Sequence, residues 1–302
     1  MPKTAKTLTD ESEAFLKALD DAPLGAILKD RQSKEWMETL VLRALTKLET
    51  ARYHRANLRR LVRRNERRFK QHVAGIDENP GGLSKHMTAT HAGVLPAGDI
   101  AHELDALLAA IRSSIDFGGR VLGLHLGMDR KTSITKVVKA AKNPANHPFA
   151  FLLAWEPWIV EIQHYRDECT HYRTLRLQTG YEAVYRHGVL AWSLRPVVIP
   201  KRHGHDRPDT RMDRMMEDPV KDPVGLNRLE RSMVAKATDG TILTVEHSLE
   251  YVPAEGYIRV EQFSARHVRK LERFLAAVFK DAAAANFMFQ SGTPVPSGTA
   301  DE

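Results

Sequence analysis

Hydrophobic side chains recur every three or four positions through most of residues 1–185, which is the spacing of amphipathic helices. Between Ser33 and Gly75 the chain contains neither glycine nor proline, and its apolar positions keep this spacing. We therefore expect one continuous helix over residues 33–74, roughly 60 Å long at the rise of an α-helix.

Two further helices are expected from the same spacing. A capping pattern precedes Phe15 and predicts a short first helix that ends near Pro23. Another helix begins at about Asp99, and the pair Gly118-Gly119 is expected to stop or bend it. Both helices have apolar positions at helical spacing, which are typical of helices that pack in a core.

Beyond Pro157 the pattern predicts a helix that ends near Gly180. Its apolar seam has a period of about 3.6 residues and comprises Trp158, Ile162, Tyr165, Cys169 and Tyr172. The spacing then changes, and segments rich in Val, Ile, Leu and Trp predict strands at 189–199, 241–251 and 257–263. Ser264 is a suitable N-cap for a last helix.

These elements predict a mainly α fold, in which a helical bundle carries a smaller strand-containing C-terminal region. The expected organisation is an N-terminal helix over 1–30, a bundle over 31–185, a strand-rich region over 186–263, a C-terminal helix over 264–290 and a disordered tail over 291–302.

Composition is that of a globular protein with an anionic partner. The chain has 302 residues, of which 42% are hydrophobic, and a formal net charge of +7. Its single cysteine excludes an internal disulfide, and the N-terminal segment lacks the apolar core of a secretory signal. No apolar run approaches the roughly 18 residues that cross a bilayer. We expect a cytoplasmic protein that does not enter a membrane.

The positive charge is concentrated in the second half of the long helix. Nine basic residues lie between Arg52 and Lys70, against the single acid Glu66. On a helix the arginines form two neighbouring rows, which are Arg52, Arg55, Arg59 and Arg63, and Arg60, Arg64, Arg67 and Arg68. Because the arginine fork matches phosphate, both rows are expected to contact the phosphate backbone of a nucleic acid. The alternatives are a solvated helix face and a helix paired with an acidic protein surface.

An arginine and a histidine, Arg166 and His171, are separated by four residues on the helix after Pro157. Histidine exchanges protons near neutral pH, and arginine is a permanent cation that holds phosphate. The same spacing occurs at Arg67/His72 and Arg120/His125, so spacing alone does not identify a site.

The segments 101–105 and 112–117, followed by Arg166-Asp167-Glu168-Cys169-Thr170-His171, resemble the HEPN superfamily, and the resemblance covers about residues 35–180. Proteins of this superfamily are helical bundles that often form dimers. Many are metal-independent ribonucleases of toxin, anti-phage and RNA-processing systems, and others bind RNA or partners without cutting. The resemblance implies an RNA-binding protein and a candidate endoribonuclease in toxin-antitoxin or anti-phage defence.

The resemblance also implies roles for individual residues. His171 would act as base on a ribose 2′-OH or as acid on the leaving oxygen, and Arg166 would stabilise the phosphorane. Asp167 would orient the imidazole, and Glu103 or Asp105 would position these groups. Arg166 and His171 lie roughly 140° apart on an ideal helix, so a homodimer that pairs two such helices is expected.

Two other classes of function are compatible with the sequence. Glu161 and His164, and Glu168 and His171, form two Glu-x-x-His units seven residues apart, a spacing that can bind a transition metal. The second class is a non-catalytic interaction or scaffold protein that has a basic docking helix. No glycine-rich nucleotide loop is present, and we expect no cofactor.

Overall fold

A computed structural model describes residues 3–21, 31–77, 97–129, 131–143, 149–169, 177, 180–186, 189–201, 225–238 and 240–290. The helices are α1 (Lys3–Asp21), α2 (Arg31–Asp77), α3 (Ala97–His125), α4 (Ile134–Ala141), α5 (Phe151–Asp167) and α6 (Val260–Gln290). The strands are β1 (Gly180–Arg186), β2 (Val189–Arg195), β3 (Val198–Pro200), β4 (Leu226–Lys236), β5 (Ile242–Pro253) and β6 (Tyr257–Arg259). The predicted mainly α fold is confirmed.

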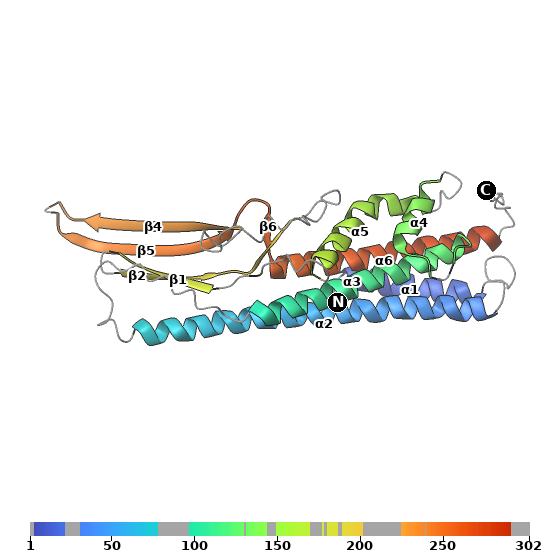
Figure 1. Cartoon of the computed structure of the whole chain (residues 1–302), viewed down its shortest axis with the longest axis horizontal. Coiled ribbons are helices and arrows are strands. Elements are labelled where there is room, and N and C mark those ends of the chain that lie inside the picture. The colour runs from blue at the N-terminus through green and yellow to red at the C-terminus, as the bar shows by residue number, and fades with distance from the viewer. Residues whose placement is uncertain are drawn as a thin grey trace.

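The helix α2 forms one side of an elongated bundle, and α3 runs antiparallel along it (Figure 1). The 47 residues of α2 contain no proline, and their one glycine, Gly75, lies in the last turn, so the helix continues without a break. The apolar stripe of α2 is buried against α3 and α6, and it comprises Met37, Leu40, Val41, Ala44, Leu48, Ala51 and Leu58. Ser114 of α3 donates a hydrogen bond to the carbonyl oxygen of Ala44 at 2.7 Å, which fixes the two helices in register.

The last helix, α6, returns along the bundle and contacts α1, α2 and α3. Phe279 of α6 stacks on Phe15 of α1 with ring centroids 6.1 Å apart. On the opposite side, Phe274 packs against Trp155 and Trp158 of α5 at 5.7 and 5.8 Å. One continuous hydrophobic core therefore joins the N-terminal helix, α5 and the C-terminal helix.

The glycine pair in α3 does not stop the helix, because α3 continues to His125. A Cβ atom at Gly118 would lie 3.1 Å from Leu275 of α6, and one at Gly119 would lie 2.6 Å from the side chain of Ile134 of α4. The two glycines allow close approach of neighbouring helices, which offsets their low helix propensity.

Three antiparallel strand pairs follow α5. β1 pairs with β2, β3 with β6, and β4 with β5. The strands β1 and β4 were not predicted, and the expected strand at 257–263 is limited to Tyr257–Arg259 because α6 begins at Val260. Helix α5 begins at Phe151 and contains Pro157, whereas a start after this proline was expected. The predicted bundle range 31–185 therefore contains most of β1.

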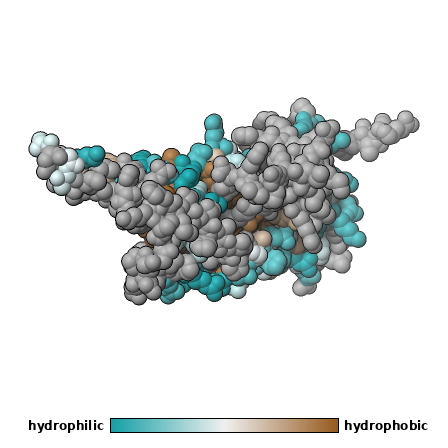
Figure 2. Space-filling model, turned by 60° about the vertical axis from the view of Figure 1, so that its left-hand side comes forward, coloured by the Kyte–Doolittle hydropathy of each residue, from teal (hydrophilic) through white to brown (hydrophobic). Residues whose placement is uncertain are grey.

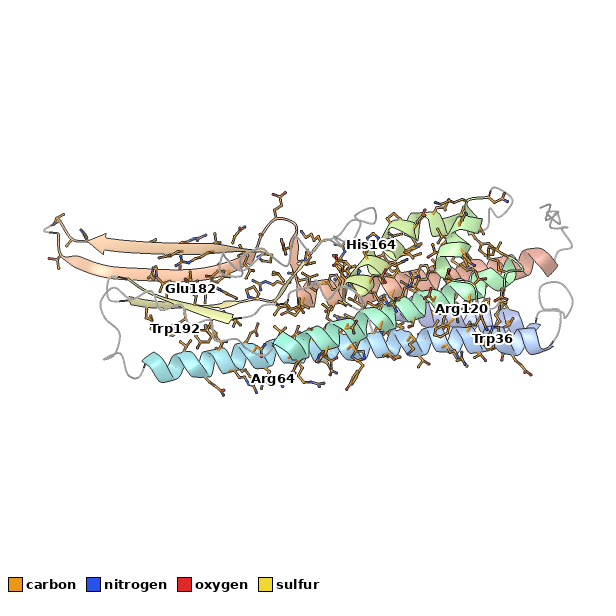
Figure 3. The ribbon with its side chains drawn as sticks, viewed as in Figure 1. Trp36, Arg64, Arg120, His164, Glu182 and Trp192 are labelled. Carbon is orange, nitrogen blue, oxygen red and sulfur yellow. The ribbon has the colours of Figure 1, made fainter. Side chains whose placement is uncertain are left out.

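A buried carboxylate organises the strand pairs. Glu182 of β1 accepts hydrogen bonds from Tyr251 of β5 and, at 3.1 Å, from Arg195 of β2. Arg228 of β4 lies 3.3 Å from the same carboxylate. Figure 3 shows Glu182 and Trp192 on the β1–β2 hairpin, above the C-terminal part of α2. This network joins four strands beside a small apolar core of Val184, Ala191, Leu249 and Tyr251.

Candidate nucleic-acid interface

Five basic side chains on the outer face of α2 line a hollow of about 530 Å³ together with Ala56 and Glu66. We call these five residues the α2 strip: Arg59, Arg60, Arg63, Arg67 and Lys70. All five are exposed. On an ideal helix the lining residues fall within an arc of roughly 120°, and the strip is about 16 Å long from Arg59 to Lys70. Where the atoms are coloured, the edge that α2 forms is mainly hydrophilic (Figure 2).

The opposite face of this part of α2 is held by the rest of the protein. Leu58 and Asn65 are buried, and Phe69 packs against Tyr181 of β1 with ring centroids 5.9 Å apart. The helix is therefore anchored along the length of the strip, and its basic side chains extend from a fixed backbone. Preorganised charges of this kind bind an anion without first being ordered.

Two of the predicted phosphate contacts have partners inside the protein. Arg52 bonds to Glu272 of α6 at 2.7 Å and also pairs with Glu49. Burial tends to lower the pKa of Arg52, but these two carboxylates raise it above the ordinary value. Arg64 lies 2.6 Å from Asp99 of α3. These two arginines bind α2 to its neighbouring helices. Of the other predicted contacts, Arg55 is half-buried and Arg68 is exposed, and neither lines the hollow.

The members of the α2 strip lack carboxylate partners of this kind among the described residues. Within the described residues, no member of the α2 strip forms an ion pair, since the carboxylates that reach arginines of α2 bind Arg52 and Arg64. Glu66 is the one acid that lines the hollow among these residues. Burial raises the pKa of Glu261 in α6, and the nearby Glu66 carboxylate adds to this effect. Mutual repulsion among the strip's cations is relieved when an anion lies between them.

Of the Arg166–His171 motif, the structure describes the residues up to Cys169. Arg166 is in the last turn of α5, and its side chain is 40% exposed. Its guanidinium lies 3.4 Å from the carboxylate of Asp167, so the structure brings these two predicted site residues together. His171 lies outside the described residues.

Helix α3 carries both candidate positioning acids. Glu103 faces α2, where His54 lies 2.7 Å from one carboxylate oxygen and Asn57 donates to the other at 3.2 Å. Asp105 is exposed. Burial, together with the charges of Asp105 and Glu168, raises the pKa of Cys169 to about 12, so Cys169 remains a neutral thiol near pH 7.

A buried polar cluster between α5 and α6 was not found from the sequence. Trp158 donates a hydrogen bond to Nδ1 of His267 at 3.0 Å, and the carboxylate of Glu161 lies 3.4 Å from Nζ of Lys270 and 3.9 Å from Nε2 of His267. Glu161 belongs to the first predicted Glu-x-x-His unit, and here it pairs with the cation Lys270 of α6. Among the described residues, no three His, Cys, Asp or Glu side chains form a group suited to a metal ion.

The burial of His267 predicts acid-sensitive stability. Burial, with the charges of Lys270 and Arg266, lowers its pKa to about 3, whereas the unfolded chain has the ordinary value near 6.5. Between these values the unfolded state binds the proton and the folded state does not. The stabilisation is therefore complete above about pH 6.5 and is lost as the pH falls toward 3.

We expect His267→Gln, which keeps an acceptor for Trp158, to reduce this acid dependence. From pH 7 to pH 4 the wild type should lose at least about 1 kcal/mol more unfolding free energy than the variant. Urea unfolding at each pH measures this difference. Parallel losses in the two proteins would contradict it.

No protein-family model, curated protein sequence or solved structure matches this chain. The resemblance to the HEPN superfamily therefore rests on the motif residues and stays a prediction. In the part of the chain that the structure describes, no helix is long and apolar enough to span a bilayer.

Proposed function

We propose that this protein binds RNA through the α2 strip. The observation that supports it is a row of exposed cations without carboxylate partners among the described residues, on a helix whose other face is buried. Arginine forms four of the five members, and its planar fork binds phosphate oxygens in pairs. The resemblance to the HEPN superfamily indicates RNA as the polyanion.

An acidic protein is the rival partner for the same surface. Both partners would be attracted by the strip, but they differ in the salt dependence of binding. RNA carries a layer of condensed counterions that binding releases, whereas an acidic protein surface carries little. The salt dependence of the dissociation constant therefore distinguishes the two classes of partner.

We expect the affinity for RNA to fall steeply with salt. Five phosphate contacts give a slope of log K against log salt of roughly −3.5 to −4.5, which is a loss of roughly 100- to 500-fold between 50 and 200 mM. Fluorescence anisotropy of a labelled 20-nucleotide RNA in KCl measures it. A slope near zero, or no binding at 50 mM salt, would contradict the proposal.

RNA cleavage is a further step in the same proposal. Arg166 lies in the last turn of α5 with a side chain that is 40% exposed. The chemistry needs His171 beside the same phosphate, and the expected homodimer supplies a second copy of both residues. Binding through the α2 strip does not depend on cleavage, so the two steps are separable by experiment.

A further inference from the structure

The side chains that line the hollow can bind a nucleic-acid backbone but have little means to read bases. Among the described residues, the lining contains four arginines, a lysine, a glutamate and an alanine. Base reading in single strands relies on aromatic stacking, and amide side chains read base edges. Phe69 is turned to Tyr181, and Asn57 and Asn65 are buried on the other face of α2. Tyr53 is exposed but is not part of the lining.

The strip has two flanks that lie along a straight helix. On an ideal helix Arg60 and Arg67 lie on one flank, Arg59 and Lys70 on the other, roughly 80° apart on average, with Arg63 between them. A single strand offers one row of phosphates and must be straightened to follow a rigid helix. A duplex offers two rows in fixed positions across a groove, which suits two flanks of fixed charge.

The packing of α2 limits how deep a nucleic-acid groove the strip can enter. Arg64, beside the strip, is tied to Asp99 of α3, and Leu58 and Asn65 are buried on the opposite face, so the rest of the bundle covers one side and the back of α2 along the strip. The major groove of B-form DNA is about 8.5 Å deep, and a helix enters it only when its sides are free. The minor groove of A-form RNA is wide and shallow and admits a surface that projects little.

We propose that the α2 strip binds double-stranded RNA across its minor groove, without preference for sequence. This inference rests on the proposed function and names its ligand class. The two flanks hold phosphates on the two strands, and Arg63 lies over the groove between them. Double-stranded RNA is recognised in this way by its shape and its phosphates.

Counterion release determines how much more tightly the strip binds a duplex than a single strand. A duplex releases about 0.9 ions per phosphate contact and a single strand about 0.7, so five contacts differ by about one ion. At 0.1 M salt this difference corresponds to roughly tenfold tighter binding of the duplex.

The test compares three labelled probes of one sequence at 0.1 M KCl: a 20-base-pair RNA duplex, its unstructured single strand and the corresponding DNA duplex. We expect the RNA duplex to bind about tenfold more tightly than the single strand, and more tightly than the DNA duplex. A second RNA duplex of shuffled sequence should bind equally well. Equal or tighter binding of the single strand or of the DNA duplex would overturn this inference and leave RNA binding intact. Failure of every RNA probe to bind would instead overturn the proposed function.

Two flank variants test the geometry independently of overall affinity. Arg60→Gln/Arg67→Gln and Arg59→Gln/Lys70→Gln each remove one flank and the same charge. Each should reduce the ratio of duplex to single-strand affinity toward one. If either variant weakens both probes by the same factor, the two-flank arrangement is wrong.

Discussion

Replacing Arg59, Arg63 and Arg67 by glutamine together is expected to weaken RNA binding by roughly 100-fold at 0.1 M salt. Each side chain is exposed and lines the hollow, and each charged contact to phosphate contributes about 1 kcal/mol net. Their sum of about 3 kcal/mol corresponds to that factor. The salt slope should also become less steep by roughly 3, since each phosphate that the variant no longer binds accounts for about one unit. Anisotropy titrations against a labelled RNA measure both quantities.

The matched control removes three charges from another surface. Lys131, Lys136 and Lys139 are exposed on and before α4, away from the basic half of α2 in Figure 1. Their replacement by glutamine should change affinity by less than about threefold if the strip holds the phosphates. Equal weakening by both triple variants would show that net charge, and not the strip, determines binding.

A lysine version of the strip separates charge from hydrogen-bond geometry. Arg59→Lys/Arg63→Lys/Arg67→Lys keeps three cations but removes the paired donors of the guanidinium groups. We expect affinity between those of the wild type and the glutamine variant. None of these side chains forms an ion pair within the described residues, so circular dichroism should show the same helical content in all variants.

The helical bundle was predictable because helices follow from a local apolar pattern. Part of the strand region was not predictable, because it depends on contacts between distant residues. An apolar stripe without glycine or proline predicts α2 wherever it packs. The strand β1 lacks clear alternation because the carboxylate of Glu182 points inward, where Arg195 and Arg228 neutralise it. An inward carboxylate is stable only through partners on other strands, which a local pattern does not reveal. The packing role of Gly118 and Gly119 was likewise not predicted, because it depends on the neighbouring helices α4 and α6.

The candidate interface shows the same limit. The sequence revealed a concentration of arginine on α2 but not which arginines face solvent. A helix wheel places Arg52 in one row with Arg59 and Arg63, yet Arg52 binds Glu272, which is 220 residues away in the chain. Arg64 binds Asp99 in the same manner. Long-range ion pairs therefore separate Arg52 and Arg64, which have structural partners, from the α2 strip.

Cleavage of RNA in EDTA by the wild type, abolished in both Arg166→Ala and His171→Ala, is the expected result if the motif is a ribonuclease site. The ribose 2′-oxygen attacks the adjacent phosphorus and loses its proton to a base, while the 5′-oxygen leaves and takes up a proton. The products are a 2′,3′-cyclic phosphate and a 5′-hydroxyl end. General acid–base catalysis contributes roughly 100- to 10,000-fold, and His171→Ala should remove a factor of that size. End analysis of the cleaved RNA identifies the reaction.

The equally spaced pair in α3 provides the matched control. His125 is buried and bonds to the Val121 carbonyl oxygen at 2.9 Å, and Arg120 lies over the ring of Phe117 at 5.4 Å. Since His125 is buried and Arg120 packs on an aromatic ring, Arg120→Ala should leave the cleavage rate of the folded protein unchanged. All variants are compared for dimer formation and for affinity to RNA.

The two steps of the proposed function then give different results in the same variants. The substitutions at Arg166 and His171 should abolish cutting while affinity stays within about threefold, because the α2 strip holds the backbone. The glutamine triple variant should lose affinity but keep the cleavage rate at saturating RNA. Absence of cutting by the wild type, or cutting that survives both substitutions, would remove Arg166 and His171 from the mechanism and leave RNA binding by α2 as the activity to explain.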